Sequence, residues 1–383
     1  MNEATEQLMT NTLALERVHE RLGASFRDEE GWRVPASYGD VQAEYTVVRD
    51  GGVGLIDLSS RGRIRVSGSE AIMFLNGLIT NDMKTLAENH WMAAAFPNVQ
   101  GRLIAAVRVA RLADEPPNKK ASPTFLLETE AATHESVLKT ITRFTMAGDF
   151  HVTDITSETT LLSVQGKGAT EIARKVLGEA AAQIPPDGAL EIDWRQSTVT
   201  VIRATHTGED GFDLIVKSTQ AYAMWESLTG AGVQPVGHDA LEILRIEAGI
   251  ARYGRDMDET NVVTETNLDD AVSFTKGCYI GQEIIARIKY RGHVAKKLTG
   301  LTFERHEPIE VGAAIKSEEG KDIGRITSMA QSPGLERTIA LGYVRYEYLA
   351  PGTRVSVLAG ERKAVATVNQ LPFVQGSWAE NQV

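Results

Sequence analysis

The spacing of hydrophobic and polar positions changes along this chain. From residue 53, short apolar runs alternate with segments whose apolar residues recur every three or four positions, as in amphipathic helices. This pattern predicts strands at residues 54–58, 63–66, 103–110, 124–127, 160–164, 198–202 and 212–216, and helices at 70–77, 131–144, 169–177 and 220–228. Alternating strands and helices of this kind indicate an α+β fold.

The same pattern divides the chain into four parts. Apolar residues between Glu3 and Leu22 recur at helical spacings, so residues 1–40 are expected to form an N-terminal helical extension. Residues 41–149 and 150–292 are expected to be two α+β domains. From residue 293 the helical signals stop and short β runs alternate with turns, which predicts an antiparallel β-barrel at 293–375. The polar, proline-broken insert at 113–123 is expected to be a mobile surface hairpin loop.

Composition and charge argue against several classes of function. The chain has 383 residues, of which 42% are hydrophobic, enough for a sizeable core. Its net charge of -11 opposes non-specific binding to nucleic acid or an anionic membrane. It has no apolar stretch long enough to span a bilayer, and its N-terminus lacks the pattern of a signal peptide, so we expect a cytoplasmic protein. One cysteine and eight histidines without metal-ligand spacing predict no resident zinc or iron–sulfur cluster.

The single cysteine stands in a glycine-punctuated segment, Lys276-Gly277-Cys278-Tyr279-Ile280-Gly281-Gln282-Glu283, directly before a helix-like run. Glycines permit tight turns, and backbone amides at a helix start, together with Lys276 and Arg287, would stabilise a thiolate or a bound anion. In the alternative interpretation Cys278 is a small buried hydrophobic residue and the glycines only form a corner. The thiol could also be a shared ligand completed by a partner, or undergo reversible oxidation.

The pattern K-G-C-Y-x-G-Q-E resembles the signature of the YgfZ family, folate-binding proteins implicated in iron–sulfur cluster maintenance and related to the glycine-cleavage T-protein. Residues 45–105, THTGEDGFDL at 205–214, LRIEAGIARYGRDMDE at 244–259 and the C-terminal IGRITSMAQSPGLERTIALGYV are also similar to that superfamily. The resemblance covers about residues 40–370. It implies a T-protein-like multidomain arrangement around a central folate channel, tetrahydrofolate or a derivative as ligand, and iron–sulfur assembly factors or client enzymes as partners.

Two residues are expected to bind the folate. A reduced pterin offers adjacent N–H donors that one carboxylate can accept as a pair, and the resemblance assigns this contact to Glu209, for which a simple acidic turn is the alternative. Arg245 projects from an apolar side of a predicted helix at 238–249, where an unpaired guanidinium would be costly. It therefore pairs with a carboxylate such as Glu242 or Asp256, or it contacts the ligand, which is the role that the resemblance implies.

The segment Asn98 to Ala106 is informative for what it lacks. In aminomethyltransferases the corresponding strand carries an aspartate pair, one of which assists transfer at the folate nitrogens, whereas Ala105 and Ala106 occupy those positions here. Alanine cannot accept a proton. The resemblance therefore implies a folate-binding protein without glycine-cleavage activity, which supports iron–sulfur cluster assembly or repair through Cys278 and affects tRNA modification only indirectly.

Two further hypotheses remain. The chain could be a folate-dependent aminomethyltransferase, methyltransferase or demethylase with a relocated acid–base residue, or an interaction scaffold. A basic and aromatic run follows the cysteine segment and is either a solvated edge or a surface for a polyglutamate tail or an acidic partner. It comprises Arg287, Lys289, Tyr290, Arg291, His293, Lys296 and Lys297.

Overall fold

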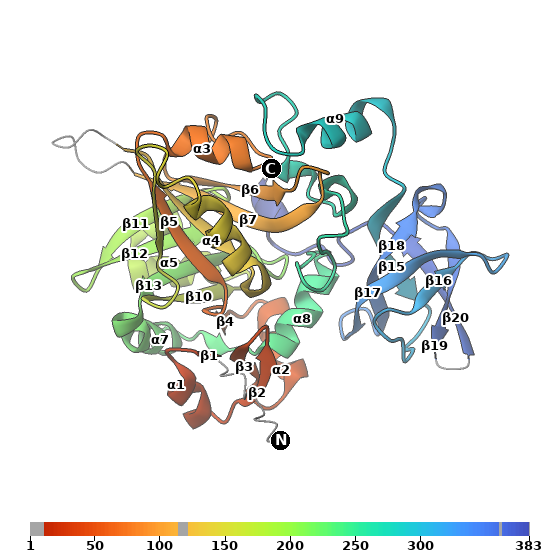
Figure 1. The fold of residues 1–383 in the computed structure, drawn as a ribbon. Helices are drawn as coiled ribbons and strands as arrows, with labels where there is room; N and C mark the ends of the chain where they lie inside the picture. Colours follow the sequence, from red (N-terminus) through yellow and green to blue (C-terminus); the bar gives the residue numbers. More distant parts are fainter. Residues whose placement is uncertain (1–10, 114–121, 360–361, 383) are drawn as a thin grey trace, which may run out of the picture.

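Two β-sheets stacked face to face form the centre of the molecule, and a β-barrel lies to one side (Figure 1). The computed structural model describes residues 11–113, 122–359 and 362–382. The loop expected at 113–123 falls mostly outside the described residues, although the strands on either side of it pair antiparallel, as a hairpin requires. Helices cover the outer faces of both sheets, so the layers run helix, sheet, sheet, helix.

The larger sheet has six strands in the order β11-β12-β13-β10-β4-β14. Their bounds are β4 Gly54–Asp57, β10 Thr159–Gln165, β11 Ala189–Trp194, β12 Ser197–Arg203, β13 Gly211–Lys217 and β14 Gln234–Pro235. Successive side chains alternate between its faces, so Leu214 packs under the outer helices while Ile215 faces the second sheet. The outer helices are α5 Ala169–Leu177, α6 Glu179–Ala182 and α7 Ala221–Gly230.

The second sheet has five strands in the order β6-β7-β8-β5-β9. Their bounds are β5 Gly62–Ser67, β6 His90–Pro97, β7 Leu103–Leu112, β8 Thr124–Thr129 and β9 His151–Asp154. Its outer face is covered by α3 (Ala71–Leu78) and α4 (His134–Thr142), which pack on a core that includes Val109 and Leu127. The strand β6 had no counterpart in the prediction, because its run of small residues shows neither period clearly.

The two sheets exchange strands across the expected boundary at residues 149 and 150. Strand β4 lies before this boundary yet pairs with β10 of the larger sheet, and β9 lies after it yet pairs with β5 of the second. Apolar residues from both sheets meet between them, among them Leu126 and Leu161. Neither sheet is therefore complete within one of the two expected segments.

The N-terminal part is less helical than the pattern suggested. Only α1 (Glu16–Arg21) is helical within the expected helix, whose first residues lie outside the described part. Gly23, at a φ of 77°, turns the chain just after α1. Segments before and after this helix in the sequence form a three-stranded sheet in the order β1-β3-β2, with β1 Asn11–Thr12, β2 Ser25–Glu29 and β3 Trp32–Ser37, before α2 Val41–Arg49 begins. The register of β2 on β3 places Glu29 and Glu30 at the tip of a hairpin that reaches the centre of the molecule.

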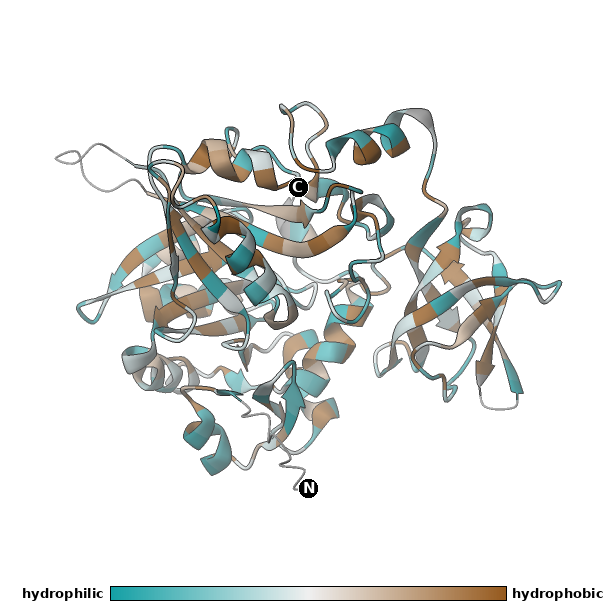
Figure 2. Ribbon diagram, in the orientation of Figure 1, coloured by the Kyte–Doolittle hydropathy of each residue, from teal (hydrophilic) through white to brown (hydrophobic). Residues whose placement is uncertain are grey.

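The C-terminal part is a closed antiparallel barrel in the order β15-β18-β17-β16-β19-β20, as the sequence indicated. Its strands are β15 Lys296–Phe303, β16 Ala314–Lys316, β17 Asp322–Ser332, β18 Arg337–Arg345, β19 Arg354–Ala359 and β20 Arg362–Asn369. In Figure 2 the hydrophobic positions alternate along these strands, and the apolar ones fill the barrel. Two helices precede the barrel, α8 His238–Glu247 and α9 Gln282–Arg291, and α8 packs against β17.

After the barrel the chain returns to the two sheets. Backbone amides of Phe373 and Val374 donate to Glu247 O, and the amide of Trp378 donates to Gly208 O. Short 3₁₀ turns complete the described elements at Ala131–Thr133, Ser218–Gln220, Val263–Glu265, Asp269–Ala271, Tyr346–Tyr348 and Ala379–Gln382.

Candidate functional site

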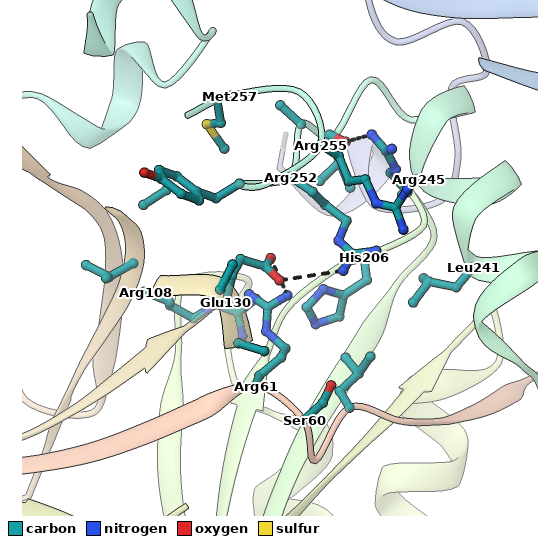
Figure 3. A pocket seen from close by; sticks show the side chains of 18 of the residues that line it. Ser60, Arg61, Arg108, Glu130, His206, Leu241, Arg245, Arg252, Arg255 and Met257 are labelled. Carbon is teal, nitrogen blue, oxygen red and sulfur yellow. Dashed lines mark hydrogen bonds and ion pairs between the residues drawn. The ribbon is translucent and has the colours of Figure 1, made fainter. Parts of the chain in front are cut away.

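A cavity of about 240 Å³ lies where one end of the two sheets meets α8 and the loop that follows it. Its wall is built from segments far apart in the sequence, namely the tip of the β2–β3 hairpin, strands β6 and β7, the ends of β8 and β12, helix α8 and residues 250–257. Apolar and aromatic side chains such as Trp91, Tyr253 and Met257 alternate with charged ones around it (Figure 3). A mixed apolar and polar lining of this kind suits a planar, polar organic ligand.

Arginines and glutamates form a continuous run of ion pairs along one wall. Arg61 Nη1 lies 2.7 Å from Glu130 Oε1, and Arg252 Nη2 lies 3.8 Å from Glu130 Oε2 and 2.5 Å from Glu29 Oε1. Burial alone would raise the pKa of the Glu130 carboxyl, but the charges of Arg61 and Arg252 hold that pKa below its ordinary value. These groups stay ionised near neutral pH, so they shape the wall and are poor proton donors or acceptors.

Arg245 reaches the same cavity from α8 and is 2% exposed. Its guanidinium pairs with Glu242, lies 2.5 Å from Asp256 Oδ2, and donates to Ser328 Oγ of the barrel at 2.6 Å. Arg245 thus pairs with both Glu242 and Asp256, the two carboxylates that the sequence analysis gave as alternative partners. The arrangement leaves Arg245 on the cavity lining while its charge is already balanced, and it joins α8 to the barrel.

His206 lines the cavity between the two sheets and is paired with the buried Asp213, which does not line it. His206 Nε2 lies 2.9 Å from Asp213 Oδ2 on β13, and Arg108 Nη1 of β7 donates to the same carboxylate oxygen at 2.5 Å. Burial alone would raise the pKa of Asp213, but the charges of His206 and Arg108 lower it below its ordinary value. The ionised Asp213 accepts a hydrogen bond from Nε2–H and orients the ring, which leaves Nδ1 outside this contact.

His238 is buried on the cavity wall beside Glu29. The side chain is 3% exposed and lines the cavity, and its Nε2 lies 3.0 Å from the Asp57 carbonyl oxygen, which can only accept. His238 Nε2 therefore donates to this carbonyl oxygen. No hydrogen bond reaches Nδ1 from the described residues, and the nearest charged oxygen, Glu29 Oε2, lies 3.6 Å away. The Nδ1 atom is itself buried and faces this carboxylate.

Ala105 and Ala106 point in opposite directions from β7. Ala105 is fully buried in the core under α3 and α4, whereas Ala106 lines the cavity. The carboxylate-free position at Ala106 is two residues from Arg108, on the same face of the strand. The cavity wall therefore has no acid–base side chain at Ala106, one of the two positions where the resemblance implied a missing aspartate.

Glu209 is absent from the residues that line the cavity. Its Oε1 lies 2.6 Å from Arg49 Nη1, and its Oε2 accepts from Ser377 N at 2.9 Å and from Ser377 Oγ at 2.6 Å. Both carboxylate oxygens are thus engaged in joining α2 to the C-terminal segment. In this structure Glu209 joins these two segments and does not line the cavity.

Three residues of the cysteine segment hold it against the sheet. The Lys276 ammonium donates to the carbonyls of Asn76, Ile79 and Asn81 at the end of α3, and Tyr279 is buried among residues behind the cavity wall. Burial lowers the pKa of Lys276 to about 8 and raises that of Tyr279 to about 12. Gly281 has a φ of 77°, and a Cβ there would meet Asn98 O at 2.3 Å.

Cys278 itself is exposed and does not line the cavity. Its neighbour Tyr279 packs in one cluster with Met257 and, at the edge of that cluster, Ala106, both of which line the cavity. Gln282 and Glu283 open α9 after this loop, with Gly277 before the thiol. The structure thus places the thiol in solvent, one residue from a side chain that packs behind the cavity.

Metal-binding and membrane-spanning features do not occur in the described part of the chain. Among the described residues, no group of three or more His, Cys, Asp or Glu side chains is placed to hold a metal ion. Within the same ranges no helix has the length and apolar character needed to cross a membrane.

The charged cavity residues were missed because their partners are remote. Glu29 pairs with Arg252, 223 positions away, and Arg61 pairs with Glu130 across two strands. One signal was present, since Arg108 and Asp213 interrupt apolar strands and a buried charge needs an opposite charge.

Comparisons with known proteins cover almost the whole chain. Residues 15–276 match the GCVT N-terminal domain, and residues 296–375 match the Glycine cleavage T-protein C-terminal barrel domain. The chain is 32% identical over 364 residues to an aminomethyltransferase of Rubrobacter xylanophilus, covering 93% of this chain and 92% of the relative. It is 31% identical over 376 residues to one of Thermotoga neapolitana, covering 96% and 99%.

A solved structure agrees with these matches. The crystal structure of the glycine cleavage system aminomethyltransferase T from Bartonella henselae superposes with a TM-score of 0.87 at 26% sequence identity. The match covers 96% of this chain and 98% of that protein. The two chains therefore share the arrangement of both sheets and the barrel.

Proposed function

This chain belongs to the glycine cleavage T-protein family, and on that premise we propose that it binds tetrahydrofolate or a derivative in the central cavity and carries out folate-dependent one-carbon transfer with His206 as the acid–base group. The fold class predicted from the sequence, an α+β T-protein-like arrangement with a C-terminal antiparallel barrel, is confirmed. The reaction differs in its proton transfer from that of relatives with a carboxylate on β7.

The observation that carries this proposal is His206 on the cavity wall, held by the buried Asp213. A general base needs a titratable group in the cavity, held by a partner that keeps the correct tautomer. Glu130 and Glu29 are committed to arginines, and Ala106 has no proton-transfer group. His206 is the residue on this wall that meets both conditions, because Asp213 fixes Nε2 and leaves Nδ1 for the substrate.

The cavity also fits a folate. A folate contributes ring nitrogens that carry the one-carbon unit, and its pterin ring is planar with N–H groups on its edge. Trp91 and Tyr253 offer aromatic surface for such a ring. Arg245 lines the same space, which supports its predicted part in folate binding.

A turnover assay tests this proposal. The protein is incubated with tetrahydrofolate and a methylated or aminomethylated amine, and formation of the folate product is followed. We expect product from the wild type, a loss of about 100-fold or more in His206→Gln, and an unchanged dissociation constant for tetrahydrofolate in that variant. Product formation by His206→Gln at the wild-type rate would remove the acid–base role.

A second function is favoured by the Cys278 loop. The YgfZ-like pattern, the exposed thiol and the anchoring of that loop by Lys276 and Tyr279 support a role in iron–sulfur cluster assembly or repair, in contact with assembly factors or client enzymes. A thiol on a fixed loop is accessible to a partner protein while its position relative to the cavity stays constant.

Complementation separates the two functions. In cells that lack this protein, we expect Cys278→Ala to leave iron–sulfur enzyme activity low while purified Cys278→Ala still turns over folate. Full restoration of iron–sulfur enzyme activity by Cys278→Ala would show that the thiol is not required. His206→Gln is the matched control, because it should spare the thiol-dependent effect.

A further inference from the structure

Five arginines line the cavity, and four of them are balanced by carboxylates. Arg61 pairs with Glu128 and Glu130, Arg108 with Glu128 and Asp213, Arg245 with Glu242 and Asp256, and Arg252 with Glu29. The fifth, Arg255, has no carboxylate within ion-pair distance in the described parts of the chain. It is exposed, so it stands where the cavity meets solvent.

The backbone around Arg255 is fixed. Its amide donates to Arg252 O at 3.2 Å, and the amide of Gly254 donates to Met257 O at 2.9 Å. The next residue, Asp256, is 1% exposed and accepts hydrogen bonds from Arg245 and from Thr327 Oγ1 of the barrel. A short loop held at both sides of Arg255 presents its guanidinium in a limited volume, alongside Arg252 and Arg245 in Figure 3.

We infer that Arg255 is a carboxylate-binding residue at the mouth of the cavity. The inference rests on the proposed function, since the cavity behind Arg255 is the one assigned to the folate. A guanidinium binds a carboxylate by two parallel, charge-assisted hydrogen bonds. The carboxylate comes either from the glutamate tail of the folate or from the one-carbon donor, and both would reach Arg255 from the solvent side.

Glu30 sets the selectivity of this mouth. It is also exposed on the cavity lining, it has no ion-pair partner among the described residues, and its Oε1 would lie 3.4 Å from a Cβ at Gly254. Its carboxylate therefore repels an incoming anion next to Arg255. Removal of this charge should strengthen carboxylate binding, the opposite of the effect of removing Arg255.

Calorimetry with two ligands tests the folate source. Tetrahydrofolate and 6-methyltetrahydropterin, which lacks the glutamate tail, are titrated into the wild type, Arg255→Ala, Glu30→Gln and the control Arg354→Ala, an exposed arginine of the barrel. If the tail binds Arg255, Arg255→Ala weakens tetrahydrofolate binding by about 5- to 20-fold and leaves the tetrahydropterin unchanged. Glu30→Gln should strengthen tetrahydrofolate binding a few-fold.

A second arm tests the donor source. With saturating tetrahydrofolate, the binding of N-methylglycine and of its amide is measured in the wild type and in Arg255→Ala. A preference for the carboxylate over the amide that Arg255→Ala abolishes assigns the carboxylate to the donor. If Arg255→Ala changes neither arm while tetrahydrofolate binds the wild type, the inference about Arg255 is overturned and the proposed function stands. If the wild type binds neither ligand, both are overturned.

Discussion

At the scale of residues, the cavity is defined by which charges are balanced. Asp213 shows the physical consequence most clearly, because it is fully buried and is held ionised by His206 and Arg108. Removing one member of a buried charge pair leaves the other uncompensated, which is more costly than the pair is stabilising.

Asp213→Asn should lower the free energy of unfolding by about 3 kcal/mol at pH 7. The pKa of Asp213 is depressed in the folded protein, so its contribution is fully present above the ordinary carboxyl pKa of about 4 and is lost as pH falls through the folded value. Urea unfolding at several pH values should therefore show the difference between wild type and variant shrinking below about pH 4. A difference that grows at low pH would contradict this assignment.

The adjacent alanines of β7 provide a matched pair. Ala105→Asp places a carboxylate in the core under α3 and α4 and should cost at least about 3 kcal/mol, whereas Ala106→Asp faces the cavity and should cost less than about 1.5 kcal/mol. Thermal unfolding measures both. Ala106→Asp should also restore part of the turnover lost in His206→Gln, and equal destabilisation by the two aspartates would show that Ala106 does not face a polar space.

At the scale of elements, the conformation of the cysteine loop depends on Gly281 and not on Gly277. Gly281 combines a positive φ with a close approach to Asn98 O, so Gly281→Ala is strained on both counts and should cost about 1–3 kcal/mol. A Cβ added at Gly277 would have no atom within 4 Å, so Gly277→Ala should be nearly neutral.

The rate of Cys278 alkylation reports on the same loop. We expect Gly281→Ala to change the reaction rate of the thiol with iodoacetamide, because the loop loses its contact with the turn at Asn98. Gly277→Ala should leave that rate within about twofold. If both variants react alike, the loop is not held at Gly281.

Elements with a clear period were predictable from the sequence. Strands such as β10 and β13 and helices such as α5 and α8 lie at or within a residue or two of the expected positions, because each has one or two well-defined apolar faces. The N-terminal sheet and β6 were missed, since short edge strands with small or charged residues carry little periodic signal. The pairing of β4 with β10 and of β9 with β5 crosses the expected domain boundary. It depends on long-range contacts, which local patterns do not encode.

The site was predictable only in part. Arg245 was placed on the cavity because a guanidinium on an apolar helix face requires a partner, whereas Cys278, singled out as the one thiol, lies outside the cavity lining. Glu209 was selected from a glycine-flanked turn, but the chain end returns from the barrel and takes both of its oxygens. The His206–Asp213 pair was not recognised, since Arg108, which holds Asp213 ionised, lies on the other sheet.

At the scale of the whole molecule, buried ion pairs connect segments that are remote in the sequence. Arg49 of α2 bridges Glu209 and Glu247 at 2.6 and 2.8 Å, Glu247 accepts from Ser332 of the barrel, and Glu209 holds Ser377. These contacts fix α8, the barrel and the C-terminal segment relative to the sheets, and so fix the shape of the cavity.

Glu209→Gln should lower stability by about 2–4 kcal/mol without changing tetrahydrofolate affinity by more than about twofold. The reason is that the residue supports the C-terminal segment and lies off the cavity lining. Thermal unfolding and calorimetry on the same preparation measure the two effects. A large loss of folate affinity in a stably folded Glu209→Gln would instead restore its predicted role as the pterin receptor.

Calorimetric titration of tetrahydrofolate into the wild type and into Ala106→Phe, a variant whose new side chain fills the cavity, tests the account most directly. Unfolding temperatures of the two proteins are compared first to establish that the variant is folded. If the cavity binds the folate, the wild type has one binding site with a micromolar dissociation constant, and Ala106→Phe binds at least about 30-fold more weakly. No heat at several hundred micromolar ligand, or equal affinity in both proteins, would contradict it.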